Sequence, residues 1–257
     1  MKKICFFDID GTLLDHDKKL PSSTKEAIES LKENGVYVAI ATGRAPFMFE
    51  ELRKELAIDS YVSFNGQFVV YEKEVIFKNP LSKKALHKLY EQADIKNHPL
   101  VFMNEHEVRG TVDYSQHVEE TLRAFQLAHP KRDERFFEEN DIYQTLFYCT
   151  DEEEAYFQNI SEEIRYIRWH PVCVDVVPAN GSKANGILQF IEKAGFKMEN
   201  VYAFGDGLND IEMLSMVGTG IAMGNAEKEL FKRADVITTS VDDDGIYNGL
   251  RKVNVIE

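Results

Sequence analysis

A chain of 257 residues, 44% hydrophobic and 29% charged, is long enough for one large domain or for a core with a smaller inserted domain, and this composition argues against disorder. The formal net charge of −14, with no run of Lys or Arg, argues against nucleic acid and anionic membranes as partners. Three scattered cysteines, the lack of a signal peptide and the lack of a membrane-length apolar run predict a cytoplasmic protein with reduced thiols.

The first element is an apolar strand that ends in two acids. The apolar run from Ile4 leads directly into Asp8-Ile9-Asp10-Gly11-Thr12. An uninterrupted apolar run is typical of a strand buried in a parallel sheet, and ligands of open α/β sheets bind at the carboxyl ends of such strands. An isolated Asp-x-Asp is more often a cap or a solvated turn. Whether Asp8 and Asp10 form a functional site therefore depends on the residues found further along the chain.

A helix and a second apolar strand follow. Ser23 and Glu26 have the spacing of a capping box, and Asn34-Gly35 ends the predicted helix. The next strand covers residues 36–41 and stops at Thr42-Gly43-Arg44. Two strands of the predicted sheet thus end in polar residues at equivalent points.

The next segment predicts a short helix and a hairpin. A helical pattern runs from about Phe47 to Leu56, and two apolar runs on either side of Asn65-Gly66 carry the signal of a tight turn between strands. A further strand covers residues 74–77. Beyond Pro80 the strand-then-glycine pattern stops.

Residues 81–177 predict an inserted α+β domain, because scattered acids replace the strand-then-glycine endings there. The predicted helices cover residues 82–92, 117–128 and 152–164, and the predicted strands cover residues 145–149, 164–170 and 173–177.

From Pro178 the alternation of strand and helix returns. Ser182-Lys183 opens a helix, and a strand over residues 201–204 stops at Gly205-Asp206-Gly207-Leu208-Asn209-Asp210. Two short strands near residues 220–223 and 235–238, separated by a helix from near Asn225, complete the pattern. The fold class predicted is α/β, with a doubly wound, mainly parallel, Rossmann-like core over residues 1–80 and 178–257.

Polar residues at strand ends and helix starts should gather along one edge of this sheet. They are Asp8, Asp10, Thr42, Lys183, Asp206, Asn209 and Asp210. A carboxylate that attacks a phosphate faces repulsion, since two unit charges about 4 Å apart repel by roughly 4 kcal/mol at an effective dielectric near 20. Mg²⁺ on the oxygens of Asp8 and Asp206 and the backbone near Asp10 would reduce that repulsion, as would the Lys183 ammonium.

Thr42 and the backbone amides of Ile9 and Gly43 can donate hydrogen bonds to the remaining phosphate oxygens. Hydrolysis further needs one acid that attacks and one that manages protons. Asp8 is predicted to attack, and Asp10 to protonate the leaving alcohol and then to activate water. The sequence thus indicates a phosphate and magnesium site.

The four polar stretches, Asp8 to Leu14, Thr42 to Arg44, Ser182-Lys183 and Gly205 to Asp210, resemble in order and spacing the motifs of the haloacid dehalogenase (HAD) superfamily. The resemblance is to its Cof-type phosphatases, and residues 81–177 stand where that group carries a type 2 (C2B) cap. One departure is Ala184, where related phosphatases usually have Gly after the lysine.

By this resemblance, Asp8 is the nucleophile and Asp10 the general acid and base, while Mg²⁺ is held by Asp8, the Asp10 backbone and Asp206. The phosphate would contact Ile9, Thr42, Gly43, Lys183 and Asn209, and Asp210 would orient Lys183. The resemblance implies a Mg²⁺-dependent phosphatase that hydrolyses a small-molecule phosphomonoester through an aspartyl-phosphate. We expect a monomer or weak homodimer.

Alternatives stay open at this point. A sugar phosphomutase needs the same nucleophile, and a catalytically silent phosphate-binding regulatory domain would keep the same fold. Arg44 could approach the substrate or pair with a cap acid. The sequence leaves sugar phosphates, pyridoxal phosphate and flavin mononucleotide equally available as substrates.

Overall fold

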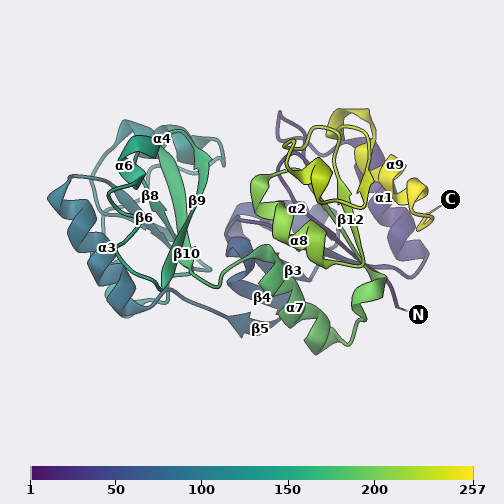
Figure 1. The fold of residues 1–257 in the computed structure, drawn as a ribbon, viewed down its shortest axis with the longest axis horizontal. Coiled ribbons are helices and arrows are strands. Elements are labelled where there is room, and N and C mark those ends of the chain that lie inside the picture. Colours follow the sequence, from purple (N-terminus) through teal and green to yellow (C-terminus); the bar gives the residue numbers. More distant parts are fainter. Residues whose placement is uncertain (1, 257) are drawn as a thin grey trace. The chain divides into compact units, whose positions relative to one another are not determined.

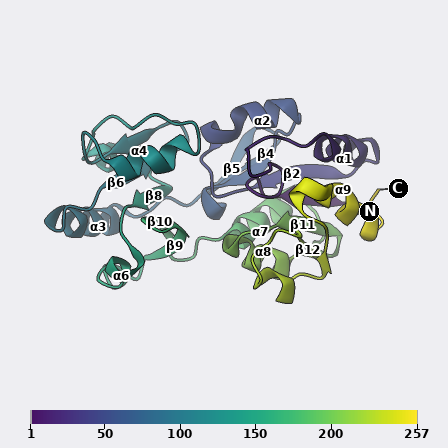
Figure 2. The same cartoon turned by 90° about the horizontal axis from the view of Figure 1, so that it is seen from above.

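The computed structural model describes residues 2–256, which fold into two compact units (Figures 1 and 2). The first unit comprises the chain up to Gly43, Glu50–Phe77, and the chain from Ser182 onward. The second unit comprises Arg44–Phe49 and Lys78–Gly181. The predicted insertion, residues 81–177, lies within the second unit, which also includes the short segment after Gly43.

The first unit is built on an eight-stranded sheet in the order β13-β12-β11-β1-β2-β3-β4-β5. Neighbouring strands from β13 to β3 run parallel, and β3 and β4 form an antiparallel pair. The mainly parallel sheet predicted from the sequence is therefore confirmed. The strands are β1 (Ile4–Phe7), β2 (Tyr37–Ala41), β3 (Tyr61–Ser63), β4 (Phe68–Tyr71), β5 (Glu74–Lys78), β11 (Val201–Gly205), β12 (Thr219–Ala222) and β13 (Val236–Ile237).

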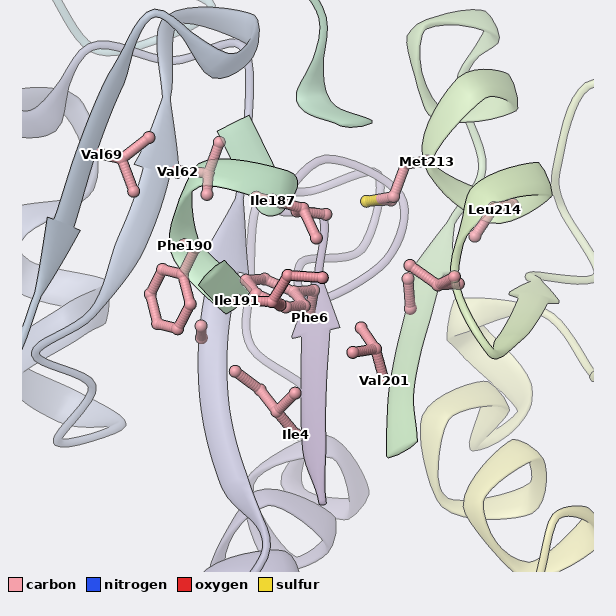
Figure 3. Close-up of a cluster of buried hydrophobic side chains, with 14 of the residues drawn as sticks. Ile4, Phe6, Val62, Val69, Ile187, Phe190, Ile191, Val201, Met213 and Leu214 are labelled. Carbon is pink, nitrogen blue, oxygen red and sulfur yellow. The ribbon is translucent and has the colours of Figure 1, made fainter. Parts of the chain in front are cut away.

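Helices cover both faces of this sheet, which explains why all four residues of β1 are apolar and fully buried. On one face, Ile4 and Phe6 pack with Phe190 of α7 and Met213 of α8 (Figure 3). The Phe6 and Phe190 rings meet edge to face, with their centroids 5.2 Å apart. The α-helices of this unit are α1 (Ser22–Glu33), α2 (Glu50–Glu55), α7 (Lys183–Ala194), α8 (Ile211–Met216) and α9 (Gly245–Lys252).

The other face of the sheet packs against α9. The rings of Phe7 and Phe204 stack with centroids 5.0 Å apart, and the Gly249 backbone lies so close that an added Cβ would be 2.6 Å from the Phe204 ring. Helix α1 packs beside α9. Between β12 and β13, residues 223–235 contain the 3₁₀ turn Leu230–Lys232 but no α-helix, so the helix predicted from near Asn225 is wrong.

The second unit contains a five-stranded sheet in the order β7-β6-β8-β10-β9, with antiparallel neighbours throughout. Its α+β character agrees with the sequence prediction. The elements are α3 (Lys83–Ile95), β6 (Leu100–Met103), β7 (Val108–Gly110), α4 (Gln116–Arg123), α5 (Phe136–Glu139), β8 (Gln144–Phe147), α6 (Asp151–Glu154), β9 (Ile164–His170) and β10 (Cys173–Pro178).

Two details of this unit correct the sequence prediction. The helix predicted over residues 152–164 is only the single turn α6, which begins with a capping box between Thr150 and Glu153. The strands β6 and β7 were not predicted. Across residues 2–256, no helix is both long enough and apolar enough for a membrane crossing.

Candidate active site

The carboxyl end of β1 delivers Asp8 to the edge of the sheet. The Asp8 amide still donates to the Phe204 carbonyl at 3.0 Å, as if the strand continued. The chain then turns back sharply, because Leu13 donates to the Asp8 carbonyl at 3.2 Å and Leu14 donates to the Ile9 carbonyl at 2.8 Å. Asp8 is 7% exposed, so its carboxyl group is held in place and largely shielded from water.

Gly11 allows a second acid to come close to this turn. Its φ of +78° lies in the left-handed region, and a Cβ added there would be 2.2 Å from Oδ2 of Asp206. Thr12 donates from its hydroxyl to Oδ1 of Asp206 at 2.9 Å. The turn after β1 therefore both leaves room for Asp206 and fixes its orientation.

Lys183 lies between two carboxylates at the first residue of α7. The hydroxyl of Ser182 caps this helix by accepting from the Asn185 amide at 3.2 Å. The Lys183 Nζ is 2.6 Å from Oδ1 of Asp8 and 2.7 Å from Oδ1 of Asp210, and its side chain is fully buried. A buried charge is tolerated only when it is paired and hydrogen-bonded, and both conditions hold here.

Both carboxylate oxygens of Asp210 bind neighbouring groups of the protein. Its Oδ2 accepts hydrogen bonds from the amides of Asp206 and Gly207, each at 3.0 Å, while its Oδ1 accepts from Lys183. Both oxygens are thus engaged, and the residue is fully buried. This geometry suits an acid that holds Lys183 and the loop after β11 in place.

Asp8, Asp206 and Asp210 form a group of acids, and one carboxylate oxygen from each lies within 4.8 Å of the other two. Burial raises the pKa of Asp8 to about 7 and that of Asp206 to about 8; Lys183 lowers both values, whereas repulsion from the neighbouring carboxylates raises them. The pKa of Lys183 is also raised, because the attraction of Asp210 and Asp8 outweighs the effect of its burial.

This group fits a divalent cation. When ionised, three carboxylates and one ammonium leave two uncompensated negative charges in a largely buried space. Burial is the largest cause of the raised pKa values of Asp8 and Asp206, and repulsion between the carboxylates adds to it. Carboxylate oxygens are the ligands that Mg²⁺ prefers. Asp8 and Asp206 are the better candidates as ligands, because the oxygens of Asp210 are already engaged by Lys183 and two amides.

Asp10 is not one of these three acids, and it forms an ion pair with Lys18. Their Nζ and Oδ1 atoms are 2.5 Å apart, with side chains 35% and 32% exposed. Lys18 reaches this position from a turn in which its φ is +60° and its amide donates to the Asp15 carbonyl at 3.0 Å. A half-exposed ion pair contributes only about 0–1 kcal/mol, so this contact can be broken at little cost.

Thr42 and Gly43 follow β2, at the same end of the sheet as Asp8. Thr42 is 1% exposed, and its amide donates to the Val62 carbonyl at 2.8 Å. Asn209 lies in the loop after β11 and donates from Nδ2 to Oδ1 of Asn65 at 3.0 Å. The backbone N–H of Asn65 also donates to the Thr42 carbonyl at 3.0 Å, and its side chain lies beside Gly43. The predicted phosphate contacts Thr42, Gly43 and Asn209 therefore share the neighbour Asn65.

Four residues that contact this site were not in the predicted set. Thr12 and Lys18 contact Asp206 and Asp10, Asn65 contacts Asn209, and Asn225 donates from Nδ2 to the Gly11 carbonyl at 2.8 Å. Two of the four lay in stretches that the sequence singled out: Thr12 within the motif from Asp8 to Leu14, and Asn65 in the Asn-Gly turn. The Asn-Gly signal predicts a local conformation and says nothing of a contact with a residue far along the chain.

Arg44, left open by the sequence, belongs to the second unit. Its guanidinium lies over the Phe125 ring, 5.3 Å from the centroid, and its Nη1 donates to the Met48 carbonyl at 3.5 Å. Contacts with an aromatic ring and a backbone carbonyl occupy this cation, whichever of the two predicted roles it has.

The chain is similar to known phosphatases over nearly its whole length. The family model described as haloacid dehalogenase-like hydrolase matches residues 5–250. The Bacillus subtilis protein named "Putative phosphatase YkrA" is 45% identical over 255 residues, which cover 99% of each chain. A solved structure of a hypothetical protein from Geobacillus kaustophilus HTA426 superposes with a TM-score of 0.93 at 54% identity and covers 100% of both chains.

A second solved structure carries a functional description. It is the HAD subclass IIB sugar phosphatase BT4131, with a TM-score of 0.90 and 30% identity, and the match covers 99% of this chain and 100% of that one. The family match and the arrangement of the buried Asp8 and Lys183 with the half-buried Asp206 agree with the motifs seen in the sequence. The chain therefore belongs to the haloacid dehalogenase-like hydrolases and is a phosphatase of their Cof-type group.

Proposed function

We propose that this phosphatase depends on Mg²⁺ and hydrolyses a small-molecule phosphomonoester through an aspartyl-phosphate on Asp8. The observation that carries the proposal is the buried Lys183 ammonium, which lies 2.6 Å from Asp8 beside the carboxylate of Asp206. A nucleophile held this close to a fixed cation can approach a dianionic phosphate with much of the repulsion removed.

Asp8, Asp206 and the backbone carbonyl of Asp10 are the groups we propose as protein ligands of Mg²⁺. Bound there, the ion would neutralise charge between the nucleophile and the phosphate. The raised pKa values of Asp8 and Asp206 support this proposal, because burial and the neighbouring carboxylates disfavour the ionised forms more than Lys183 stabilises them. The phosphate oxygens would be held by Lys183, Asn209, the Thr42 hydroxyl and the amides of Ile9 and Gly43.

The reaction has two balanced steps. In the first, a carboxylate oxygen of Asp8 forms a bond to phosphorus, the ester P–O bond breaks, and the protonated Asp10 gives its proton to the leaving alkoxide. In the second, Asp10 accepts a proton from water, the water oxygen bonds to phosphorus, and the bond to Asp8 breaks. Inorganic phosphate leaves, and both aspartates return to their starting protonation states.

The Lys18 contact fits the second step better than the first. An ammonium 2.5 Å from Asp10 stabilises its ionised form, which is the form that accepts a proton from water. Proton donation in the first step requires Asp10 to release Lys18. Since a half-exposed ion pair is worth only about 0–1 kcal/mol, this release costs little relative to a catalytic barrier.

We propose a sugar phosphate or a similar metabolite as substrate. The description of the similar protein BT4131 as a sugar phosphatase supports this choice, and pyridoxal phosphate and flavin mononucleotide are kept as alternatives. Residues 81–177 would act as a cap that excludes folded proteins and moves to admit small molecules. The three free, buried cysteines support a cytoplasmic location, and we expect a monomer or weak homodimer.

The test is the release of inorganic phosphate from a panel of phosphomonoesters, measured as initial rates with Mg²⁺ and with EDTA. We expect phosphate release that EDTA abolishes, together with a ranking of leaving groups that identifies the substrate class. Asp8→Asn is the matched control and should be inactive. Turnover that persists in EDTA, or wild-type rates from Asp8→Asn, would overturn the proposal. An isomerised sugar phosphate without released phosphate would indicate a mutase.

A further inference from the structure

The turn between β3 and β4 holds three successive residues in left-handed backbone conformations. The φ values are +51° for Phe64, +53° for Asn65 and +97° for Gly66. Residues other than glycine adopt this region uncommonly, and such conformations persist where the surroundings fix them, often at functional sites. Asn65 is moreover 1% exposed, although side chains of this type usually lie at the surface. The turn therefore does more than join two strands.

The first contact of Asn65 is with the turn after β2. The backbone N–H of Asn65 donates to the Thr42 carbonyl at 3.0 Å. Its side chain lies close to Gly43, where an added Cβ would be 3.1 Å from both Nδ2 and Oδ1 of Asn65. Backbone and side chain together thus set the position of Thr42 and Gly43.

The second contact joins the turn to the helix that begins at Lys183. A Cβ on Gly66 would lie 1.9 Å from the Ser182 carbonyl oxygen, which accepts the first hydrogen bond of α7 from Gly186 at 3.1 Å. Only glycine permits this approach, both for its space and for its positive φ. The turn and the start of α7 are therefore in direct backbone contact.

The third contact is with the loop after β11. Oδ1 of Asn65 accepts from Nδ2 of Asn209 at 3.0 Å, across 144 positions of sequence. The backbone carbonyl of Asn65 also has a partner, because it accepts a hydrogen bond from Nε2 of the buried Gln67 side chain at 2.9 Å. A buried polar side chain that is held in this way gives its partner one defined orientation.

We infer that Asn65 is a positioning residue for the bound phosphate. Through one side chain it orients Asn209 and supports the Thr42–Gly43 turn, while its neighbour Gly66 fixes the start of the Lys183 helix. Asn65 acts through these groups and is not itself a group that reacts. The inference rests on the proposed function, because it takes Thr42, Gly43, Lys183 and Asn209 as the groups that hold the phosphate.

The test compares Asn65→Gly with Asn65→Ala. Both variants remove the side-chain amide of Asn65. Glycine adopts φ near +53° freely, whereas alanine is strained there. The readouts are KM against kcat with the best substrate of the panel, and the Kd for inorganic phosphate with Mg²⁺, measured by calorimetry. We expect both variants to raise KM and the phosphate Kd by up to about tenfold, the loss expected when one buried hydrogen bond is removed, with a smaller change in kcat.

Two further variants separate positioning from loss of fold. Asn254→Gly changes another asparagine with φ +53° that lies outside the site, and it should leave both constants unchanged. In the double variant Asn65→Gly/Asn209→Ala, the loss of phosphate affinity should be smaller than the sum of the two single losses, because part of the effect of Asn65 passes through Asn209.

The outcomes distinguish this inference from the proposed function. If the wild-type protein releases phosphate but Asn65→Gly binds phosphate as tightly as the wild type, or if the two losses add in the double variant, the positioning role is overturned and the phosphatase stands. If only Asn65→Ala is impaired, backbone strain is the cause and the inference is overturned. If the wild-type protein neither binds phosphate nor turns over any ester, the proposed function and this inference both fall.

Discussion

The Nζ of Lys183 lies 2.6 Å from Oδ1 of Asp8, and neither residue is open to bulk water. The two residues are 175 positions apart in the sequence. They meet because β1 ends, and α7 begins, at the same edge of the sheet. In this pairing the cation lowers the pKa of Asp8 against the larger effect of burial. The properties of the site depend on the balance between these two effects.

Removal of the Lys183 charge should damage both stability and activity. In Lys183→Met, Asp8 and Asp210 lose their shared partner, which for a buried ion pair costs about 3–5 kcal/mol. Loss of a preorganised charge at the phosphate should lower kcat by about 10²–10³-fold or more. Lys193→Met, which changes an exposed lysine on the same helix, is the control. Urea unfolding and initial rates measure the two effects, and a wild-type result for Lys183→Met would contradict this account.

Without metal, the Asp8 and Asp206 pair should make stability fall as pH rises. Both acids bind a proton more tightly in the folded chain, with pKa values of about 7 and about 8 in place of the ordinary 3.8. Their contribution is therefore fully present below about pH 4 and is lost as pH rises through 7 to 8. Each kcal/mol lost lowers the Tm of a domain of this size by about 2–4 °C.

Asp206→Asn isolates this effect from the other titrating groups. Its amide carries no charge, so its Tm in EDTA should rise relative to that of the wild type between pH 5 and pH 9, as the buried repulsion disappears. Mg²⁺ should raise the Tm of the wild-type protein more at pH 8 than at pH 5. At either pH it should raise the Tm of Asp206→Asn less than that of the wild type. A Tm difference independent of pH would show that the two carboxylates do not titrate as described.

Gly11→Ala should weaken metal binding. The new methyl group would lie 2.2 Å from Oδ2 of Asp206, and the φ of +78° is unfavourable for alanine. Gly35→Ala supplies the backbone effect alone, because its φ is +70° and no atom lies within 4 Å of an added Cβ. Gly35→Ala should lose about 1–2 kcal/mol of stability from backbone strain, and Gly11→Ala should lose more, because the clash with Asp206 is added to the same strain. Only Gly11→Ala should need about tenfold more Mg²⁺ for half-maximal rate, and equal Mg²⁺ requirements would argue against Asp206 as a ligand.

The three thiols should not react with thiol reagents in the native protein. Cys5, Cys149 and Cys173 are buried, and burial raises the pKa of Cys149 to about 11, so little reactive thiolate is present at pH 8. A thiol reagent such as DTNB should label less than one group per native chain within minutes and all three in guanidinium chloride. Rapid labelling of the folded protein would show that one of these side chains is accessible.

The sequence predicted those parts of the fold and site that depend on local patterns. The apolar run before Asp8, the stop at Thr42-Gly43 and the stop before Asp206 each identify a strand and its end, and the topology of a parallel sheet then brings the ends together. Capping was less predictable. Helix α1 begins at Ser22 after Pro21, with no side-chain cap, although Ser23 and Glu26 had the spacing of a capping box.

Contacts that join distant segments gave no local signal. The Asn65-Gly66 pair correctly predicted the turn between β3 and β4, but nothing in its neighbours indicates a hydrogen bond with Asn209. Lys18 likewise reaches Asp10 only because a turn with positive φ places it there. In the second unit the acidic run from Asp151 begins a helix as predicted, but the helix ends after one turn. Phe157, Ile160 and Ile164 keep a helical spacing, yet they pack into the core of this unit from turns and from β9, so tertiary packing overrides the local pattern.

The central claim is that Asp8 carries the phosphate between the two steps, and direct trapping tests it. The protein is mixed with its best substrate and Mg²⁺, quenched in acid within the first turnover and reduced with borohydride, which converts an aspartyl-phosphate to homoserine. Peptide mass spectrometry should find this product at position 8 in the wild type and in Asp10→Asn, where slower breakdown should increase it. Modification at another residue, or phosphate release with no trapped intermediate in Asp10→Asn, would contradict the assignment of Asp8 as the nucleophile.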